Sequence, residues 1–91
     1  MSKLVVIFES KELTQAQYDS VLVEMGEKLA NANRPIHIAF QKGDSWCVVD
    51  VWESEEALND FAMNVIIPAF TKLGIQPPQP QVFPLHNLMN G

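Results

Sequence analysis

The stretch IHIAFQKGDSWCVVDVWES, from Ile36 to Ser54, decides the fold. Two runs rich in β-branched and aromatic residues, Ile36 to Gln41 and Trp46 to Glu53, are separated by four residues that contain Gly43. Such runs favour strands, and a glycine at the first central position of a two-residue turn favours a hairpin. The stretch therefore predicts two neighbouring antiparallel strands joined by a tight turn.

The turn also predicts which side chains of the two strands oppose each other. With Lys42 opposite Ser45, one face of the hairpin is uniformly apolar, and it carries Ile36, Ile38, Phe40, Cys47, Val49 and Val51. On the other face His37 falls opposite Asp50, and directly opposed residues have Cβ atoms about 4.5–5.5 Å apart. We therefore predict that His37 is the partner of Asp50, an acid in an otherwise apolar strand. A three-residue loop would break this pairing, because a one-residue slip moves side chains to the other face.

The segment before the hairpin predicts a strand and a helix. Leu4 to Phe8 has the composition of a buried strand. Thr14 and Gln17 have the spacing of a capping box, so an amphipathic helix should begin there. That helix should end near Asn31–Asn33, before Pro35.

The segment after the hairpin predicts a second helix and a last strand. Ser54 can cap the helix, Pro68 should interrupt it, and Gly74 should end it. Gln81 to Asn87 is strand-like, and Pro84 within it predicts a position at the edge of the sheet.

The predicted order of elements is β-α-β-β-α-β, within a single domain that spans residues 1–91. This order is typical of the ferredoxin-like α+β fold, a four-stranded antiparallel sheet with both helices on one face. The other face of the sheet would stay bare. Because that face is apolar, we expect a second copy of the chain to cover it in a homodimer.

Composition and charge narrow the classes of protein to consider. The chain has 91 residues, a hydrophobic fraction of 47% and a formal charge of −5, without a basic patch. These features argue against nucleic acid and against an anionic membrane surface as partners. Leu4 to Phe8 is too short for a signal peptide or a membrane span. With Cys47 as the only cysteine, we expect a cytoplasmic protein without an internal disulfide.

The polar residues at one end of the predicted sheet are the candidate catalytic groups. The ferredoxin-like topology brings together the ends of three strands there, with His37, Asp50 and His86 near Arg34 and Trp52. A histidine oriented by a carboxylate can act as an acid or base near neutral pH. The alternative is that His37 and Asp50 form a structural ion pair, for example at a dimer seam.

Other sites are weaker candidates. His37, His86 and Asp50 could supply two histidines and a carboxylate to a metal, but they have no characteristic spacing, so we expect no metal site. Cys47 is expected to be a core residue, since an apolar face raises the pKa of a thiol. The chain has no phosphate loop, nucleophile elbow or paired-cysteine motif, and no cofactor is expected. A ligand pocket between helices and sheet is expected to be lined by Tyr18, Met25, Trp52, Phe61 and Phe70, which would serve equally well as core residues.

The segment VDVWESEEALNDF, Val49 to Phe61, resembles the dimeric α/β-barrel superfamily, and in particular the antibiotic-biosynthesis-monooxygenase-like proteins. The shared pattern is a strand that ends in Trp-x-Ser, followed by a helix with an inward-facing alanine and aromatic residue. Here these residues are Trp52, Ser54, Ala57 and Phe61. The resemblance implies a homodimer in which two sheets pack face to face into a barrel. It also implies a possible ligand pocket in each subunit.

The resemblance suggests an activity without specifying a substrate. Members of the superfamily include cofactor-free monooxygenases that oxidise aromatic molecules, and haem-degrading enzymes. The haem-degrading set is not matched here, because Leu4 to Phe8 has no asparagine and Phe61 stands where those enzymes have a tryptophan. The expectation is a cofactor-independent monooxygenase-like enzyme for a small apolar or aromatic molecule. The alternative is a non-catalytic dimeric module for small-molecule binding or assembly.

Overall fold

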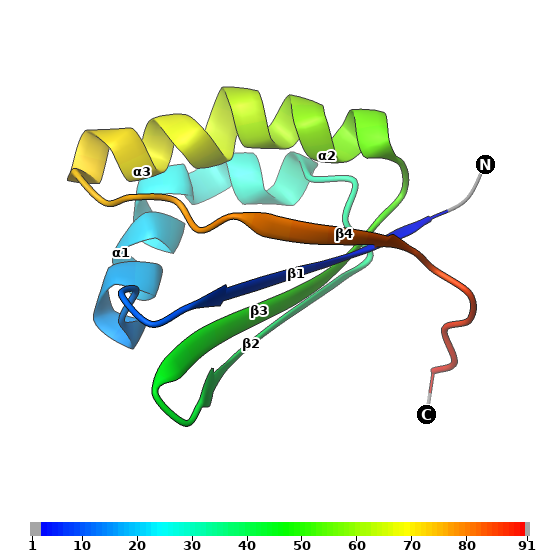
Figure 1. Ribbon diagram of the computed structural model, residues 1–91. Helices are drawn as coiled ribbons and strands as arrows, with labels where there is room; N and C mark the ends of the chain where they lie inside the picture. The colour runs from blue at the N-terminus through cyan, green and yellow to red at the C-terminus, as the bar shows by residue number, and fades with distance from the viewer. Residues whose placement is uncertain (1–2, 91) are drawn as a thin grey trace.

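The computed structural model describes residues 3–90, which form a twisted four-stranded sheet with helices on one face (Figure 1). The elements in chain order are β1 (Leu4–Ser10), α1 (Gln15–Met25), η1 (Gly26–Asn31), β2 (Ile36–Lys42), β3 (Ser45–Trp52), α2 (Glu55–Phe61), η2 (Ala62–Ile66), α3 (Ile67–Leu73) and β4 (Pro80–Pro84). The strand order is β2-β3-β1-β4, and all neighbouring strands are antiparallel. This is the predicted ferredoxin-like α+β arrangement.

The β2–β3 hairpin has the predicted register. Lys42 lies opposite Ser45, and His37 lies opposite Asp50. Gly43 has φ of +56°, whereas no residue other than glycine has a positive φ among the described residues. A positive φ at the first central position alone is the signature of a type II′ turn, which suits a hairpin because it matches the twist of the strands.

The start of α1 is as predicted, but its end is not. The Thr14 hydroxyl accepts a hydrogen bond from the Gln17 amide at 3.1 Å, and the Gln17 side chain accepts one from the Thr14 amide at 3.0 Å. The α-helix ends at Met25, several residues before the predicted end at Asn31–Asn33. Gly26 has φ of +55°, which departs from helical geometry, and the chain continues as the 3₁₀ segment η1.

The second helical segment follows the sequence signals closely. The Ser54 hydroxyl accepts a hydrogen bond from the Ala57 amide at 3.0 Å. The α-helical geometry is interrupted by the π-helical turn η2, and Pro68 lies in the first turn of α3, where its missing N–H is tolerated. Gly74 ends α3 in the left-handed conformation.

The outer strands differ from their predicted lengths. β1 continues to Ser10, beyond the predicted Phe8, while β4 covers Pro80–Pro84 rather than Gln81 to Asn87. β4 is an edge strand, as Pro84 indicates. Pro84 lies opposite Leu4, and the next amide, that of Leu85, donates to the Lys3 carbonyl at 2.9 Å. Because hydrogen-bonded and non-hydrogen-bonded pairs alternate, the Pro84 nitrogen faces away from β1, where a missing N–H is tolerated.

The two faces of the sheet have different surroundings. The face under the helices holds the core, where Val6 and Trp52 are fully buried. The other face, which we call the open sheet face, carries Val5, Ile7, Ile36, Ile38, Phe40, Cys47, Val49, Val51 and Phe83. Cys47 and Val51 in the middle of this face are buried, but Ile38 is 51% exposed and Phe83 is 48% exposed, so residues 3–90 leave part of this apolar face uncovered. Among the described residues, no helix combines the length and hydropathy that crossing a bilayer requires.

Candidate functional site

Three elements contribute to a chain of hydrogen bonds on the helix-covered face. His37 Nδ1 on β2 lies 2.5 Å from Asp50 Oδ1 on β3, so the predicted contact between these residues is confirmed. The Tyr18 hydroxyl on α1 lies 2.5 Å from His37 Nε2. Since this face is opposite to the open sheet face, the His37–Asp50 pair does not form a seam between sheets packed through their open faces.

The donor and acceptor roles of these atoms determine which group donates in each of the two hydrogen bonds. A carboxylate can only accept hydrogen bonds, so Asp50 accepts from His37 Nδ1–H. The Nε2 atom of a neutral His37 is then an acceptor, and the Tyr18 hydroxyl donates to it. The order hydroxyl–imidazole–carboxylate is the connectivity that allows a hydroxyl proton to move to a histidine that a carboxylate orients.

The second oxygen of Asp50 explains how a buried acid is tolerated. Asp50 is 2% exposed, and its Oδ2 atom accepts a hydrogen bond from Trp52 Nε1 at 3.3 Å. The Arg34 guanidinium lies 3.8 Å from the same oxygen and balances its charge. Arg34 is itself held over the rings of Trp52 and Phe61, at 5.5 Å and 5.9 Å from their centroids.

The Tyr18 ring is packed between aromatic neighbours. It is nearly parallel to the His37 ring, with the two ring centroids 6.0 Å apart. The centroid of the Trp46 ring lies 5.3 Å from that of Tyr18. Burial raises the pKa of the Tyr18 hydroxyl above its usual value of 10.0; Arg34 partly opposes this rise, and the charges of Asp50 and Asp19 add to it. Tyr18 is therefore protonated at neutral pH and available as a donor.

The raised pKa of Tyr18 can be measured directly, because the chain contains a single tyrosine. We expect the absorbance of tyrosinate to appear with a midpoint above pH 10 in the folded protein and near pH 10 after denaturation. The folded-state pKa is the higher one, so Tyr18 contributes stability below pH 10, and this contribution is lost as the pH rises through the folded-state pKa. In Asp50→Asn the midpoint should fall, since one charge that raises the pKa is gone. An unchanged midpoint on unfolding would contradict the desolvated position of Tyr18.

A small apolar cavity lies beside this chain of hydrogen bonds. Its volume is about 70 Å³, and it lies between α1, the sheet and the segment that follows α3. Its lining residues are Phe8, Leu13, Tyr18, Val21, Leu22, Met25, Arg34, His37, Trp46, Val48, Asp50, Ile66, Phe70, Pro77 and Pro78. Polar groups therefore meet the cavity only at a few points.

The structure brings some of the predicted pocket residues to this cavity and not others. Tyr18, Met25 and Phe70 line it. Trp52 and Phe61 do not line it, because their rings pack against each other with centroids 5.5 Å apart beneath Arg34. The sequence predicted an inward position for Tyr18, between the helices and the sheet, but no sequence signal indicated its contact with His37.

Trp46 is a further group at the cavity, although its sequence context favours a core or interface residue over one that stacks on a ligand. It lines the cavity next to Tyr18 and is 7% exposed. Its indole N–H is buried and has no acceptor among residues 3–90. A buried donor without a partner costs about 1–3 kcal/mol, so this N–H is suited to an acceptor atom of a bound molecule.

His86 does not join the site. Val6 of β1 lies opposite Asp50 of β3 on one side and opposite Val82 of β4 on the other, so Val82 is the β4 residue nearest the level of Asp50. His86 lies past the end of β4. Figure 1 shows the chain leaving the sheet there, and His86 is exposed. The expectation that His86 gathers with Asp50 is therefore wrong. Within the described part of the chain, no group of three or more His, Cys, Asp or Glu side chains is placed to hold a metal ion, so the two-histidine, one-carboxylate arrangement is not assembled.

Known structures share this architecture along their whole length. SnoaB, a cofactor-independent oxygenase from Streptomyces nogalater, superposes in a mutant form with a TM-score of 0.70 at 15% identity, with 100% of both chains covered. A protein from Chloroflexus aurantiacus, described as a candidate antibiotic biosynthesis monooxygenase, superposes with a TM-score of 0.67 at 16% identity and 98% coverage of both chains. NE2512 from Nitrosomonas europaea, of unknown function, gives 0.63 at 20% identity, covering 100% of this chain and 98% of its own.

These likenesses concern the fold. No protein-family model and no curated protein sequence matches the chain. At identities of 15–20%, the residues of a site need not correspond even where the backbones superpose. The chain therefore has the fold of the antibiotic-biosynthesis-monooxygenase-like structures, with a Tyr18–His37–Asp50 chain of hydrogen bonds beneath its first helix.

Proposed function

We propose that the protein is a cofactor-independent monooxygenase-like enzyme that acts on a small apolar or aromatic molecule with an acidic hydroxyl group. The observation that carries this proposal is the chain of hydrogen bonds from Tyr18 through His37 to Asp50 at the wall of an apolar cavity. The fold shared with SnoaB, which is a cofactor-independent oxygenase, supports the class of reaction.

The proposed first step is a proton transfer through Tyr18. The substrate hydroxyl donates its proton to the Tyr18 oxygen as the Tyr18 proton passes to His37 Nε2, which lies 2.5 Å away. His37 becomes an imidazolium, and Asp50 stabilises it through Nδ1–H. The products are a substrate anion and a charged His37, and no proton leaves the site.

Arg34 favours the same step by its charge. Before the transfer, Arg34 and Asp50 balance each other, so the site is close to neutral. After the transfer, the positive charges of Arg34 and His37 face the new substrate anion across an apolar cavity, where charges are poorly screened. The anion is electron-rich, and in this proposal it is the electron donor to molecular oxygen.

A panel of hydroxynaphthalenes tests the activity. We expect oxygen uptake with formation of a hydroxylated or quinone product for at least one member of the panel, at rates proportional to protein concentration. A protein that binds such molecules at the cavity but consumes no oxygen with any of them would instead be the non-catalytic binding module. The cavity by itself does not enclose an aromatic ring, so under either function part of the bound molecule lies outside it.

We further propose that two copies of the chain associate through their open sheet faces. The supporting observation is the row of exposed apolar side chains that includes Ile38 and Phe40, which are 51% and 40% exposed. A continuous apolar face of this kind is unfavourable in water, and a second copy of the same face is its simplest cover.

Placing a charge on the open sheet face should dissociate the dimer. We expect the wild-type protein to be dimeric at micromolar concentration and Ile38→Glu to be monomeric, because burying an unpaired carboxylate costs several kcal/mol. The matched control is Val23→Glu on α1, which changes a side chain that is 81% exposed outside this face and should leave the dimer intact. Sedimentation velocity measures both. A monomeric wild-type protein would exclude the proposed association.

A further inference from the structure

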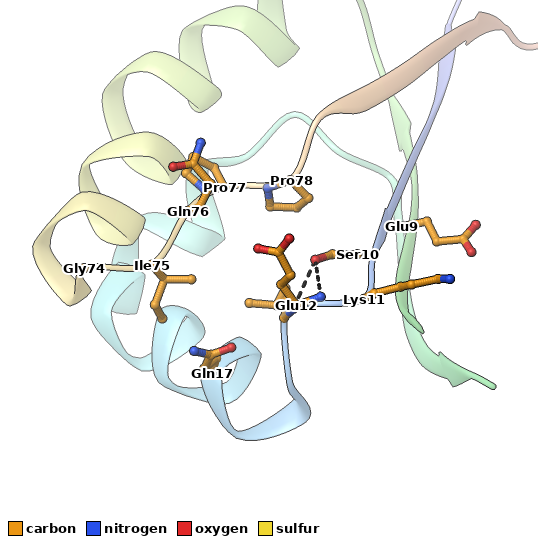
Figure 2. Close-up of a pocket in the computed structure, with 11 residues that line it drawn as sticks. Glu9, Ser10, Lys11, Glu12, Gln17, Gly74, Ile75, Gln76, Pro77 and Pro78 are labelled. Carbon is orange, nitrogen blue, oxygen red and sulfur yellow. Dashed lines mark hydrogen bonds between the residues drawn. The ribbon is translucent and has the colours of Figure 1, made fainter. Parts of the chain in front are cut away.

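A second and larger hollow adjoins the apolar cavity. It lies between the β1–α1 connection and the segment that links α3 to β4, and its volume is about 390 Å³ (Figure 2). We call it the outer groove. Its lining residues are Glu9, Ser10, Lys11, Glu12, Leu13, Gln17, Gly74, Ile75, Gln76, Pro77 and Pro78.

The outer groove and the cavity have a common wall. Leu13, Pro77 and Pro78 line both spaces. Leu13 is 8% exposed and is fixed by the Ser10 hydroxyl, which accepts a hydrogen bond from the Leu13 amide at 3.0 Å. The groove therefore lies directly beside the cavity that Tyr18 and His37 line, with these three shared side chains between the two spaces.

The two volumes show that the cavity alone is too small for an aromatic ligand, whereas the groove is large enough. The cavity of about 70 Å³ is smaller than the roughly 150 Å³ that encloses a benzene molecule. Small-molecule sites usually occupy about 300–1,000 Å³, and the groove alone lies within that range at about 390 Å³. An aromatic molecule that presents its hydroxyl to Tyr18 therefore needs space outside the cavity, and the groove is the adjoining space of sufficient size.

The groove differs from the cavity in its chemistry. Figure 2 shows the Glu12 carboxylate in the space between Pro78 and Ile75, whereas the side chains of Glu9 and Lys11 extend away from it. Glu9 is paired with Lys42 at 3.4 Å, and Glu12 forms no ion pair among residues 3–90. Lys11 also lines the groove, but of these three charged side chains only that of Glu12 points into the space in Figure 2, so a group that enters the groove meets its negative charge.

We propose that the outer groove binds a protonated amine on the substrate, which places the substrate as an amphipathic molecule with an aromatic hydroxyl end and a cationic arm. The proposal rests on the proposed function, since it assumes that the aromatic end is held at the cavity. Glu12 is the residue that recognises the arm, and Leu13, Pro77 and Pro78 contact the ring where the two spaces meet.

Three hydroxynaphthalene probes test the proposal. They share a short alkyl arm and differ only in its end, which is a primary amine, a methyl group or a carboxylate. We expect the amine probe to bind the wild-type protein about fivefold or more tightly than the carboxylate probe at low salt, with the methyl probe between them, as measured by calorimetry. In Glu12→Gln the affinity for the amine probe should fall about two- to fivefold, and affinity for the methyl probe should not change.

The matched control is Glu27→Gln, which removes an exposed negative charge on η1, away from the groove. It should leave the order of the three probes unchanged. Equal binding of all three probes in wild type and Glu12→Gln overturns the proposal for the groove and leaves the proposed activity standing. Binding of the amine probe without any change in the His37 imidazole NMR signals contradicts the proposed function instead. Binding of none of the probes overturns both.

Discussion

Replacing Asp50 with alanine is expected to lower the free energy of unfolding by about 3–5 kcal/mol, because removal of one partner leaves buried groups uncompensated. Asp50 is 2% exposed. It accepts hydrogen bonds from His37 Nδ1–H and Trp52 Nε1–H and forms an ion pair with the Arg34 guanidinium. Small domains are stable by only about 5–15 kcal/mol, so the loss would be a large part of the total. Urea denaturation followed by tryptophan fluorescence measures it.

The matched control for this substitution is Asp60→Ala. Asp60 is an exposed acid on α2, and its replacement should change the free energy of unfolding by less than about 0.5 kcal/mol. Asp50→Asn keeps the size of the side chain and removes the charge, so it should fall between wild type and Asp50→Ala. If Asp50→Ala costs no more than Asp60→Ala, the network around Asp50 does not hold β2, β3 and Arg34 together.

Replacing Tyr18 with phenylalanine should reduce turnover of an active hydroxynaphthalene about 10²- to 10⁴-fold, which is the usual contribution of a general acid–base group. The ring that packs on His37 and Trp46 is retained, and only the hydroxyl that bonds His37 Nε2 is removed. The loss in stability should be only about 0.5–1.5 kcal/mol, the net value of one hydrogen bond. The effect should appear in kcat rather than KM, since the ring still fills its place.

Ser20→Ala provides the matched control, because it removes another hydroxyl from α1. That hydroxyl donates to the Ala16 carbonyl at 3.0 Å on the exposed side of the helix, and its loss should leave turnover unchanged. Tyr18→Phe combined with His37→Gln should be little worse than the more damaging single variant, since groups that act as one relay are strongly non-additive. Independent, multiplicative losses would show that Tyr18 and His37 do not transfer the same proton.

The oxygen-uptake measurement and the groove experiment are independent of these variants. If Asp50→Ala is destabilised while Tyr18→Phe retains full turnover, the result supports the structural role of the hydrogen-bond network and contradicts the proton relay. In that case the activity would not depend on Tyr18, and Asp50 and His37 would only fix the position of β2 against β3.

Local signals in the sequence were sufficient for most of the fold. The Gly43 turn, the Thr14–Gln17 capping box and the Ser54 cap each depend on residues within a few positions of one another. The end of α1 differed because Gly26 departs from helical geometry through its positive φ. The bounds of β1 and β4 differed because they depend on pairing with neighbouring strands.

The candidate site was only partly accessible from the sequence. The contact between His37 and Asp50 could be predicted because the length of a hairpin turn determines the register of its two strands. Tyr18 and Trp46 could not be placed in the same way. Their contacts depend on where α1 crosses the sheet, and nothing in the helical repeat specifies that position. His86 was misplaced for a similar reason, because its position depends on the register of β4 against β1.

The sequence by itself determined the order of elements, the turn of the β2–β3 hairpin and the face of the sheet on which Asp50 lies. These follow from chain-local physics: turn geometry, capping and the alternation of side chains along a strand. Only the tertiary structure decided that the Asp50 acid connects through His37 to a tyrosine on α1, and that a cavity and a polar groove meet at Leu13 and Pro78. Such contacts arise from the packing of a helix and a linker onto the sheet, and packing depends on the whole set of buried side chains rather than on any one segment.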